Sequence, residues 1–245
     1  MKIRFQHQVA IVAGGARGIG LGIALRLSKE GAKVIVMDVQ PPQISPSDAH
    51  DLESTIVDIT NENQVKKAIG DIFDNYGRLD ILANSAGIVG PSAVNIDSYS
   101  LDAFENVLNV NLKGPFLLTK YSIPYMLKNN YGRILHITSI GGKEGNPGMI
   151  GYAASKSGLM GLIKGAGKEF AASGITINGI APAVIATPMN KDTDPKMLQY
   201  MTDKIPMKRL GTIEEVAALA CWIVSEEASF NTGVIFDLSG GRATY

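Results

Sequence analysis

A tyrosine and a lysine four residues apart are the part of this sequence best suited to acid–base chemistry. Tyr152 and Lys156 stand at the start of a helical pattern, in the run Tyr-Ala-Ala-Ser-Lys, with Ser139 before them at the end of a strand-like run. A spacing of four places both side chains on one helical face. A positive charge about 4 Å from a phenolate, at an effective dielectric constant of about 20, contributes roughly 4 kcal/mol, or about three pKa units. We therefore predict a lowered pKa for Tyr152 and proton exchange near neutral pH, although the spacing alone is also typical of an amphipathic surface pair.

A glycine-rich turn has the form of a phosphate-binding loop. The segment from Ala13 to Gly20 reads Ala-Gly-Gly-Ala-Arg-Gly-Ile-Gly and joins a strand-like run to a helical one. Gly14 would allow the tight turn, Gly18 would let the backbone approach a pyrophosphate, and Gly20 would let the helix pack on the strand. Glycine clusters also form ordinary turns, but the order strand, loop, helix favours a dinucleotide site.

Asp38 and Arg17 bear on which dinucleotide binds. Asp38 ends the second strand-like run, about 20 residues beyond the loop, where an acid bonds to the hydroxyls of the adenosine ribose. Its carboxylate would repel a 2′-phosphate, which favours NAD over NADP. Arg17 has the opposite effect, because a guanidinium in the loop could contact that phosphate, so NADP remains possible.

Polar residues also follow the next two strand-like runs. Asp58 comes after the third, and Asn84-Ser85-Ala86-Gly87 comes after the fourth. Because ligands bind beyond the carboxyl ends of parallel strands, we expect these residues to form one wall of the cofactor crevice. Each of them alone is also typical of a cap or a turn.

An alternation of strand and helix patterns positions these residues. The expected strands are 9–13, 34–37, 54–57, 79–84, 133–138 and 175–180, and the expected helices are 21–29, 62–76, about 101–127 and 152–172. This alternation predicts an α/β fold of Rossmann type, a doubly wound parallel sheet with helices on both faces. Residues 1–245 are expected to form a single dinucleotide-binding and catalytic domain. The polar segment 188–206, after a strand end, is a candidate lid.

Composition narrows the class of protein. Of the residues 45% are hydrophobic and 19% charged, and 23 basic residues balance 23 acidic ones. With no net charge, the chain is not expected to bind nucleic acid or a membrane surface.

The single cysteine, Cys221, is expected to be a buried packing residue, and with no visible export signal we expect a cytoplasmic protein. The histidines His7, His50 and His136 lack ligand spacing, so no metal site is predicted, and His136 is interpreted as structural.

The motifs, taken in chain order, resemble those of the short-chain dehydrogenase/reductase family of about 250 residues, along essentially the whole chain. The series is the glycine loop, Asp58, Asn84-Ser85-Ala86-Gly87, Asn111, Ser139, Tyr152 with Lys156, and Pro182 to Thr187. The resemblance implies that Tyr152 is the general acid/base and that Lys156 lowers its pKa and holds the nicotinamide ribose. It further implies that Ser139 orients the substrate oxygen and that Asn111 holds a water in a proton relay. The cofactor-binding residues that it implies, with those above, are Gly14, Arg17, Gly18, Ile19, Gly20, Asp38, Asp58, Ile59, Asn84, Ala86, Gly87, Tyr152, Lys156, Pro182, Ile185 and Thr187.

The segment between Ser139 and Tyr152 is expected to form part of the substrate pocket. Lys143 and Asn146 make it polar, and Arg242 could pair with the carboxylate of a substrate bound to a neighbouring subunit. We therefore expect an NAD-dependent oxidoreductase that transfers a hydride to or from a secondary alcohol or ketone, with a sugar or sugar-derived acid as substrate. The alternatives are a 3-oxoacyl-acyl-carrier-protein reductase that uses NADPH and, from another class, a non-catalytic nicotinamide-sensing protein.

Two helices suggest contacts between subunits. The helical patterns 114–127 and 152–172 carry small or apolar residues on more than one face, which is more than one sheet can cover. Together with the resemblance, this predicts a homotetramer.

Overall fold

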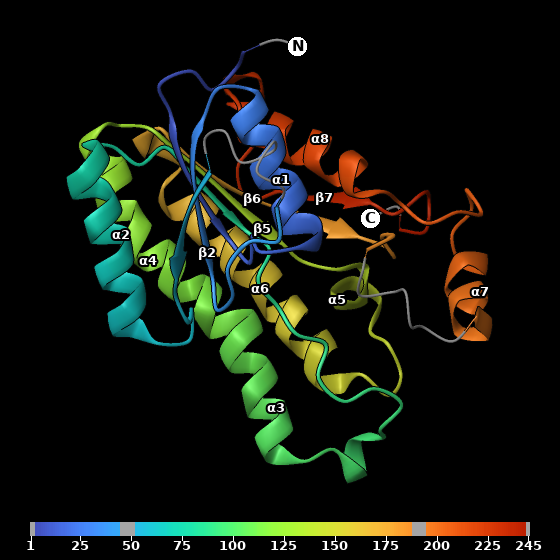
Figure 1. Cartoon of the computed structure of the whole chain (residues 1–245). Helices are drawn as coiled ribbons and strands as arrows, with labels where there is room; N and C mark the ends of the chain where they lie inside the picture. Colours follow the sequence, from blue (N-terminus) through green and yellow to red (C-terminus); the bar gives the residue numbers. More distant parts are fainter. Residues whose placement is uncertain (1–2, 45–51, 188–194, 244–245) are drawn as a thin grey trace.

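The computed structural model describes residues 3–44, 52–187 and 195–243. A seven-stranded sheet lies at its centre, with the strand order β3-β2-β1-β4-β5-β6-β7 and parallel pairing throughout (Figure 1). The strands are β1 Val9–Ala13, β2 Lys33–Asp38, β3 Leu52–Ile56, β4 Ile81–Asn84, β5 Gly132–Ile137, β6 Ile175–Pro182 and β7 Ile235–Leu238. The chain winds from β1 outward to β3 and then returns to β4 beside β1. This topology confirms the predicted doubly wound α/β fold and places the ligand crevice between β1 and β4.

Eight α-helices connect or follow the strands in the described residues. They are α1 Gly18–Lys29, α2 Glu62–Tyr76, α3 Leu101–Leu108, α4 Gly114–Lys128, α5 Ile140–Glu144, α6 Ile150–Glu169, α7 Pro195–Asp203 and α8 Ile213–Ile223. Single 3₁₀ turns lie at Ile96–Ser98, Ala171–Ser173 and Glu226–Ala228. No helix in these residues is long and apolar enough to cross a membrane.

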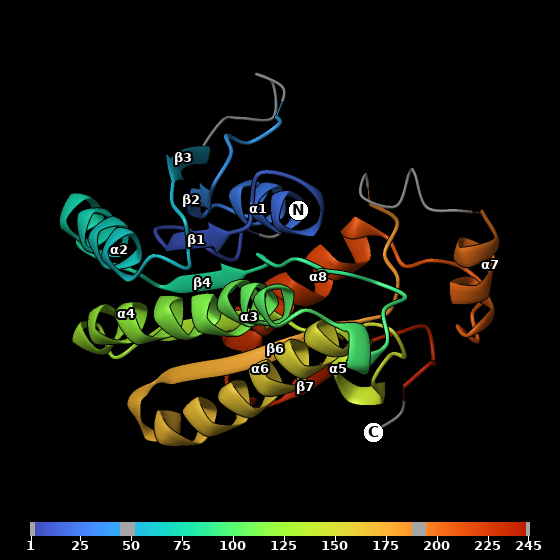
Figure 2. The same cartoon turned by 90° about the horizontal axis from the view of Figure 1, so that it is seen from below.

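The helices cover both faces of the sheet (Figure 2). One buried cluster joins α1 and α8 to the sheet, and the other joins α2, α4 and α6 to the opposite face. Strands β1, β4, β5 and β6 are buried along their whole length, as expected for parallel strands with helices on both sides. Cys221 on α8 is fully buried in the first cluster, which confirms it as a packing residue.

The structure departs from the predicted elements in a few places. The long helical pattern of 101–127 is three segments, because the π-helix Asn109–Lys113 separates α3 from α4 directly before Gly114-Pro115. The predicted substrate segment contains the short helix α5. Strand β7 and helix α8 were not predicted, although Thr212 and Glu215 form a capping box at the start of α8. Of the predicted lid, residues 188–194 lie outside the described residues, and α7 occupies much of the remainder.

Candidate active site

The glycine loop after β1 has a geometry that only glycine permits at two positions. A Cβ on Gly14, which has φ +71°, would lie 2.4 Å from the backbone nitrogen of Ala86, and one on Gly20 would lie 2.0 Å from the carbonyl oxygen of Gly14. Gly18 also has a positive φ of +57°, but nothing lies within 4 Å of its Cβ position. Gly14 and Gly20 therefore allow close packing of the backbone, whereas Gly18 leaves open space where a pyrophosphate would approach.

The N-terminus of α1 fits an anion. Arg17 precedes the helix with an extended backbone and an exposed side chain that makes no capping hydrogen bond, and the first turn carries no acidic residue. The first N–H groups of a helix lack partners within the helix, so this end is suited to a phosphate. These features and the open side of Gly18 fit a dinucleotide.

Asp38 lies beside the same loop, as predicted. Its Oδ2 accepts a hydrogen bond of 3.0 Å from the backbone N–H of Ala16, and its Oδ1 accepts one of 3.2 Å from Gln40. The carboxylate is thus fixed next to the glycine loop, where its charge opposes a 2′-phosphate.

The predicted wall residues after β3 do not all present side chains to the crevice. Asp58 is exposed, and its Oδ1 accepts hydrogen bonds from the backbone N–H and the hydroxyl of Thr60, at 2.9 and 2.8 Å. Ile59 is buried, and a Cβ on Gly114 of α4 would lie 2.5 Å from its Cδ1. Only the backbone of Ile59 therefore remains available to a cofactor, because its side chain packs toward α4.

A chain of buried hydrogen bonds fixes Asn84. The Thr119 hydroxyl lies 2.8 Å from the carbonyl oxygen of Pro115, to which it donates, and 2.9 Å from Nε2 of His136. The Asn84 amide nitrogen lies 3.3 Å from Nδ1 of the same ring, and its Oδ1 accepts from the N–H of Ala86 at 3.2 Å. With the Thr119 proton engaged, His136 must donate from Nε2 and accept at Nδ1. His136, interpreted as structural, thereby orients the Asn84–Gly87 wall, and burial lowers its pKa to about 3 with a smaller contribution from Lys156.

Asn111 lies fully buried in the π-helix, opposite this wall. Its Oδ1 accepts from the N–H of Ile88, and its Nδ2 donates to the carbonyl oxygen of Ile88 and to Oγ of Ser155. Ser155 in turn donates to the backbone carbonyl of Tyr152. Ser155 is a residue that sequence reasoning missed, although it stands inside the Tyr-Ala-Ala-Ser-Lys run. Asn111 thus links the cofactor wall to the helix that carries the predicted catalytic pair.

Lys156 lies beneath Tyr152 on α6. Its Nζ donates a hydrogen bond of 2.9 Å to the carbonyl oxygen of Ile137 and lies 5.8 Å from the centre of the Tyr152 ring. A Cβ on Gly87 would lie 3.4 Å from this Nζ, so the ammonium borders the crevice wall. Burial lowers the pKa of Lys156 to about 8.

The predicted pKa shift of Tyr152 is wrong in direction for this structure. Burial raises the pKa of Tyr152, and a hydrogen bond with the Ser139 side chain lowers it by less. Burial of the hydroxyl dominates, and Lys156 Nζ lies 5.8 Å from the ring centre rather than at the roughly 4 Å assumed from the spacing. The phenol form is therefore favoured at neutral pH.

Ser139, Tyr152 and Asn146 converge on one point. The Cβ position of Gly141 lies 2.8 Å from Nδ2 of Asn146, 3.4 Å from Oγ of Ser139 and 3.5 Å from Cε1 of Tyr152. Ser139 also caps α5, since its Oγ accepts from the N–H of Gly141 at 3.0 Å. This point is a position beside Gly141 rather than open space, so it shows that the three side chains lie together, and a hydrogen bond joins Tyr152 to Ser139. These polar groups together suit an oxygen-bearing substrate.

The two predicted cationic substrate contacts are both engaged within the chain. Lys143 forms an ion pair of 2.9 Å with Asp237, and Arg242 forms a bidentate pair with Glu144. Asn146 therefore lies beside Ser139 and Tyr152, whereas the charged groups of Lys143 and Arg242 are paired with Asp237 and Glu144.

The residues predicted to hold the carboxamide follow β6. Pro182 ends that strand and is buried, Ile185 is 5% exposed and packs in the core of the α1 face, and Thr187 is half-buried. The side chain of Ile185 thus points into the protein, so a cofactor contact there would use its backbone.

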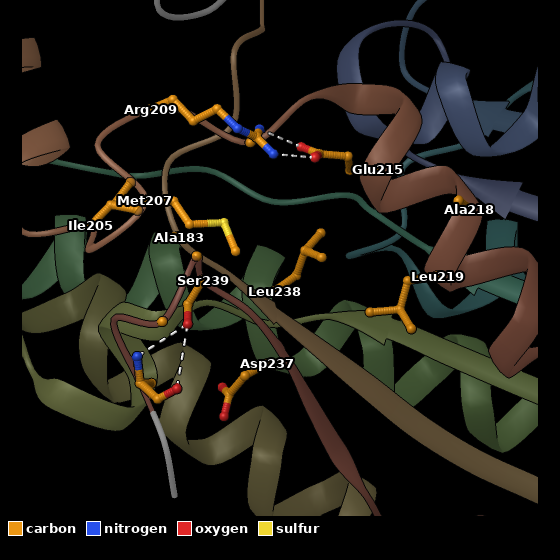
Figure 3. A pocket seen from close by; sticks show the side chains of 14 residues that line it. Ala183, Ile205, Met207, Arg209, Glu215, Ala218, Leu219, Asp237, Leu238 and Ser239 are labelled. Carbon is orange, nitrogen blue, oxygen red and sulfur yellow. Dashed lines mark hydrogen bonds and ion pairs between the residues drawn. The ribbon is translucent and has the colours of Figure 1, made fainter.

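A cavity of about 570 Å³ lies beside β7 and α8 (Figure 3). Ala183, Met207 and Leu238 line it, and the Arg209–Glu215 ion pair stands at its side. Neither Tyr152 nor Ser139 lines it, so it is not the site formed by the predicted catalytic residues.

A dinucleotide-binding loop at the β1 edge and an acid–base pair on α6 together define an oxidoreductase of the Rossmann class. A family model described as Enoyl-(Acyl carrier protein) reductase matches residues 14–243. The 2-dehydro-3-deoxy-L-rhamnonate dehydrogenase (NAD(+)) of Sphingomonas sp. (strain SKA58) is 40% identical, over 99% of this chain and 98% of that protein. The chain belongs to the short-chain dehydrogenase/reductase family, as the resemblance of its motifs predicted.

Two further relatives show the range of the similarity. The 3-oxoacyl-[acyl-carrier-protein] reductase FabG of Thermotoga maritima is 35% identical, over 98% of this chain and 99% of that protein. The ligand-free structure of Thermoplasma acidophilum aldohexose dehydrogenase superposes with a TM-score of 0.88 at 32% identity, over 97% of this chain and 94% of that one. The chain is therefore a nicotinamide-dependent oxidoreductase, and its substrate is a separate question.

Proposed function

We propose that this protein is an NAD-dependent dehydrogenase that interconverts a secondary alcohol and a ketone on a sugar-derived acid. The observation that carries the proposal is the convergence of the Tyr152 ring, the Ser139 hydroxyl and the Asn146 amide around one point. Such a group of hydrogen-bonding side chains suits a substrate rich in hydroxyls. The 40% identity to a dehydrogenase named for a deoxy sugar acid supports the same class of substrate.

The catalytic work is divided among three side chains in this proposal. A bound nicotinamide would supply the hydride chemistry at the carbinol carbon. Tyr152 takes the hydroxyl proton as a phenolate during oxidation and gives it back as a phenol during reduction. Ser139 holds the substrate oxygen beside that phenol. Lys156, whose Nζ is 2.9 Å from the Ile137 carbonyl, places a positive charge behind the ring.

Asp38 supports NAD as the cofactor. Its carboxylate is anchored to the N–H of Ala16 in the glycine loop, so it would face the 2′-position of the adenosine ribose. A phosphate there would bring two anions together, whereas two hydroxyls could donate to the carboxylate. The loop residues Gly14, Arg17, Gly18, Ile19 and Gly20, together with the backbone around Asp58 and Asn84–Gly87, would hold the remainder of the dinucleotide.

Two surfaces support a homotetramer. Phe116 on α4 is 48% exposed, and on the neighbouring α6 the Cβ positions of Gly161 and Gly165 meet nothing within 4 Å. At the other end of the sheet, β7 is an edge strand. Two different self-complementary faces produce a tetramer with two-fold axes. Light scattering on the purified protein should give four times the chain mass of 26.0 kDa, and a monomer would contradict this assignment.

The segment 188–206, which includes α7, follows the carboxyl end of β6 and would close over a bound substrate as a lid.

A cytoplasmic location agrees with the single cysteine, whose thiol is buried and whose pKa burial raises to about 12.

A substrate panel tests the proposal. The change in nicotinamide absorbance should be followed with NAD and NADP against sugars, polyols and sugar acids, and with NADH and NADPH against ketoacids and 3-oxoacyl thioesters. We expect NAD-linked oxidation of sugar acids. Activity confined to NADPH and acyl thioesters would replace this proposal with a 3-oxoacyl reductase, the activity for which one relative is named.

A further inference from the structure

Two ion pairs of opposite polarity join α5 to β7 and to the segment after β7. Lys143 Nζ lies 2.9 Å from Oδ2 of Asp237 on β7. The second pair has the opposite polarity: Glu144 of α5 accepts from Arg242 through Nε, at 3.1 Å to both oxygens, and through Nη2, at 2.5 Å. The Lys143 and Arg242 side chains are only 11% and 9% exposed. These four residues, which we call the α5 clasp, are thus more shielded from water than an ordinary surface pair.

The helix held by the α5 clasp is too short to be stable by itself. Helix α5 has five residues, and a single helical turn does not repay the cost of nucleation. Its first turn is held by Ser139, whose Oγ accepts from Gly141. Its middle packs closely on α6, where a Cβ on Gly142 would lie 2.8 Å from the backbone carbon of Lys156. The α5 clasp ties its last two residues, Lys143 and Glu144, to β7 and to the segment that follows it.

The side chain of Asp237 points toward α5 and not into the neighbouring cavity. Asp237 borders the cavity beside β7, but Figure 3 shows its carboxylate turned away from Met207 and Leu238. Side chains alternate along a strand, so Leu238 faces α8 while Asp237 faces α5. Its Oδ2 is therefore engaged by Lys143 of α5, whereas its buried Oδ1 has no hydrogen-bond partner among the described residues.

We infer that the α5 clasp positions Ser139 for the reaction, and that Arg242 acts through Glu144 rather than by binding a substrate carboxylate. This inference rests on the proposed function, because it gives Ser139 the task of holding the substrate oxygen. Loss of either ion pair would let the end of α5 move and would displace the Ser139 cap at its start. A displacement of about 1 Å in a group near the reacting atoms can lower a rate by as much as roughly 100-fold.

A double-mutant cycle separates positioning from substrate binding. Arg242→Gln and Glu144→Gln should each lower kcat by about tenfold or more, with KM changed less than twofold, and the double variant should be no worse than either single variant. The charge exchange Glu144→Arg with Arg242→Glu should recover much of the loss. If Arg242 instead binds a substrate carboxylate, Arg242→Gln will raise KM for acidic substrates only and Glu144→Gln will not, which would overturn the inference.

A matched control excludes general destabilisation. Arg4→Gln removes another Arg–Glu pair, in which Arg4, before β1, bonds to Glu30 at the end of α1. It should lower Tm and leave kcat unchanged.

Hydrogen exchange gives a readout that needs no substrate. Amides of residues 140–145 should exchange faster in Arg242→Gln and in Glu144→Gln than in the wild-type chain, and unchanged exchange would contradict the inference. If the wild type oxidised no sugar acid but the exchange result held, the proposed substrate class would fail while the α5 clasp remained.

Discussion

The side chain of Asn111 holds both backbone groups of Ile88, since its Oδ1 accepts from the Ile88 N–H and its Nδ2 donates to the Ile88 carbonyl, each at 2.8 Å. The π-helix makes this contact possible by presenting a fully buried amide from the middle of a long helical segment. The wall that begins at Asn84 and the helix that carries Tyr152 are thereby joined through one residue.

Replacing Asn111 by Leu should therefore affect cofactor binding as well as stability. The substitution removes both hydrogen bonds from Ile88, which is half-buried, and each lost bond costs about 0.5–1.5 kcal/mol. We expect a lower free energy of unfolding in urea and weaker binding of NADH in a fluorescence titration. A variant that loses stability but binds NADH as tightly as the wild type would show that the wall is held by other contacts.

Cofactor choice should change with one charge. Asp38→Asn keeps an oxygen acceptor for the N–H of Ala16 but removes the negative charge beside the glycine loop. We expect kcat/KM for NADP, relative to that for NAD, to rise by at least about tenfold. The reason is that two unit negative charges about 4 Å apart repel by about 1 kcal/mol at a dielectric constant of about 80 and by about 4 kcal/mol at about 20. An unchanged ratio would mean that Arg17 or another group sets the preference.

Acid should destabilise the protein through His136. Its pKa is about 3 in the folded chain, against an ordinary value of 6.5, because the ring is buried and, to a smaller extent, because Lys156 is positively charged. The unfolded chain therefore binds more protons than the folded one between these values, and stability falls as the pH drops through this range. Tm of the wild type should decrease between pH 7 and pH 5 more steeply than Tm of His136→Gln. Parallel curves for the two proteins would refute the assignment.

The two directions of the reaction should differ in pH dependence. Burial raises the pKa of Tyr152, so the phenol needed for reduction is present at neutral pH, whereas the phenolate needed for oxidation becomes populated only as the pH rises. We expect kcat/KM for oxidation to increase from pH 6 toward alkaline pH and kcat/KM for reduction to be already high at pH 7. An oxidation rate that stays flat over this range would contradict Tyr152 as the base.

Sequence patterns predicted most of the sheet and which strand ends and helices carry the candidate site residues, but not the contacts that these residues make. The apolar runs of β1 and β6 and the glycine loop are local signals, so their structures followed from a few neighbouring residues. The partners of Lys143 and Arg242 are 94 and 98 residues away from them, and no local pattern specifies such pairs. The pKa of Tyr152 depends on its burial, which the Tyr-Lys spacing does not reveal.

Short elements were also beyond prediction. Helix α5 is only five residues long, and strand β7 has four half-buried residues, so neither carries enough periodicity to be recognised. The position of Asn146 beside Ser139 depends on the path of the turn after α5.

The central claim is that Tyr152 performs the proton transfer of an NAD-linked dehydrogenase. The most direct test compares the wild type with Tyr152→Phe, by NADH absorbance during oxidation of the best sugar-acid substrate and by fluorescence titration with NADH. We expect kcat to fall by about 10² to 10⁴ while the Kd for NADH stays within a few fold. A Tyr152→Phe variant that keeps the wild-type kcat would contradict the account.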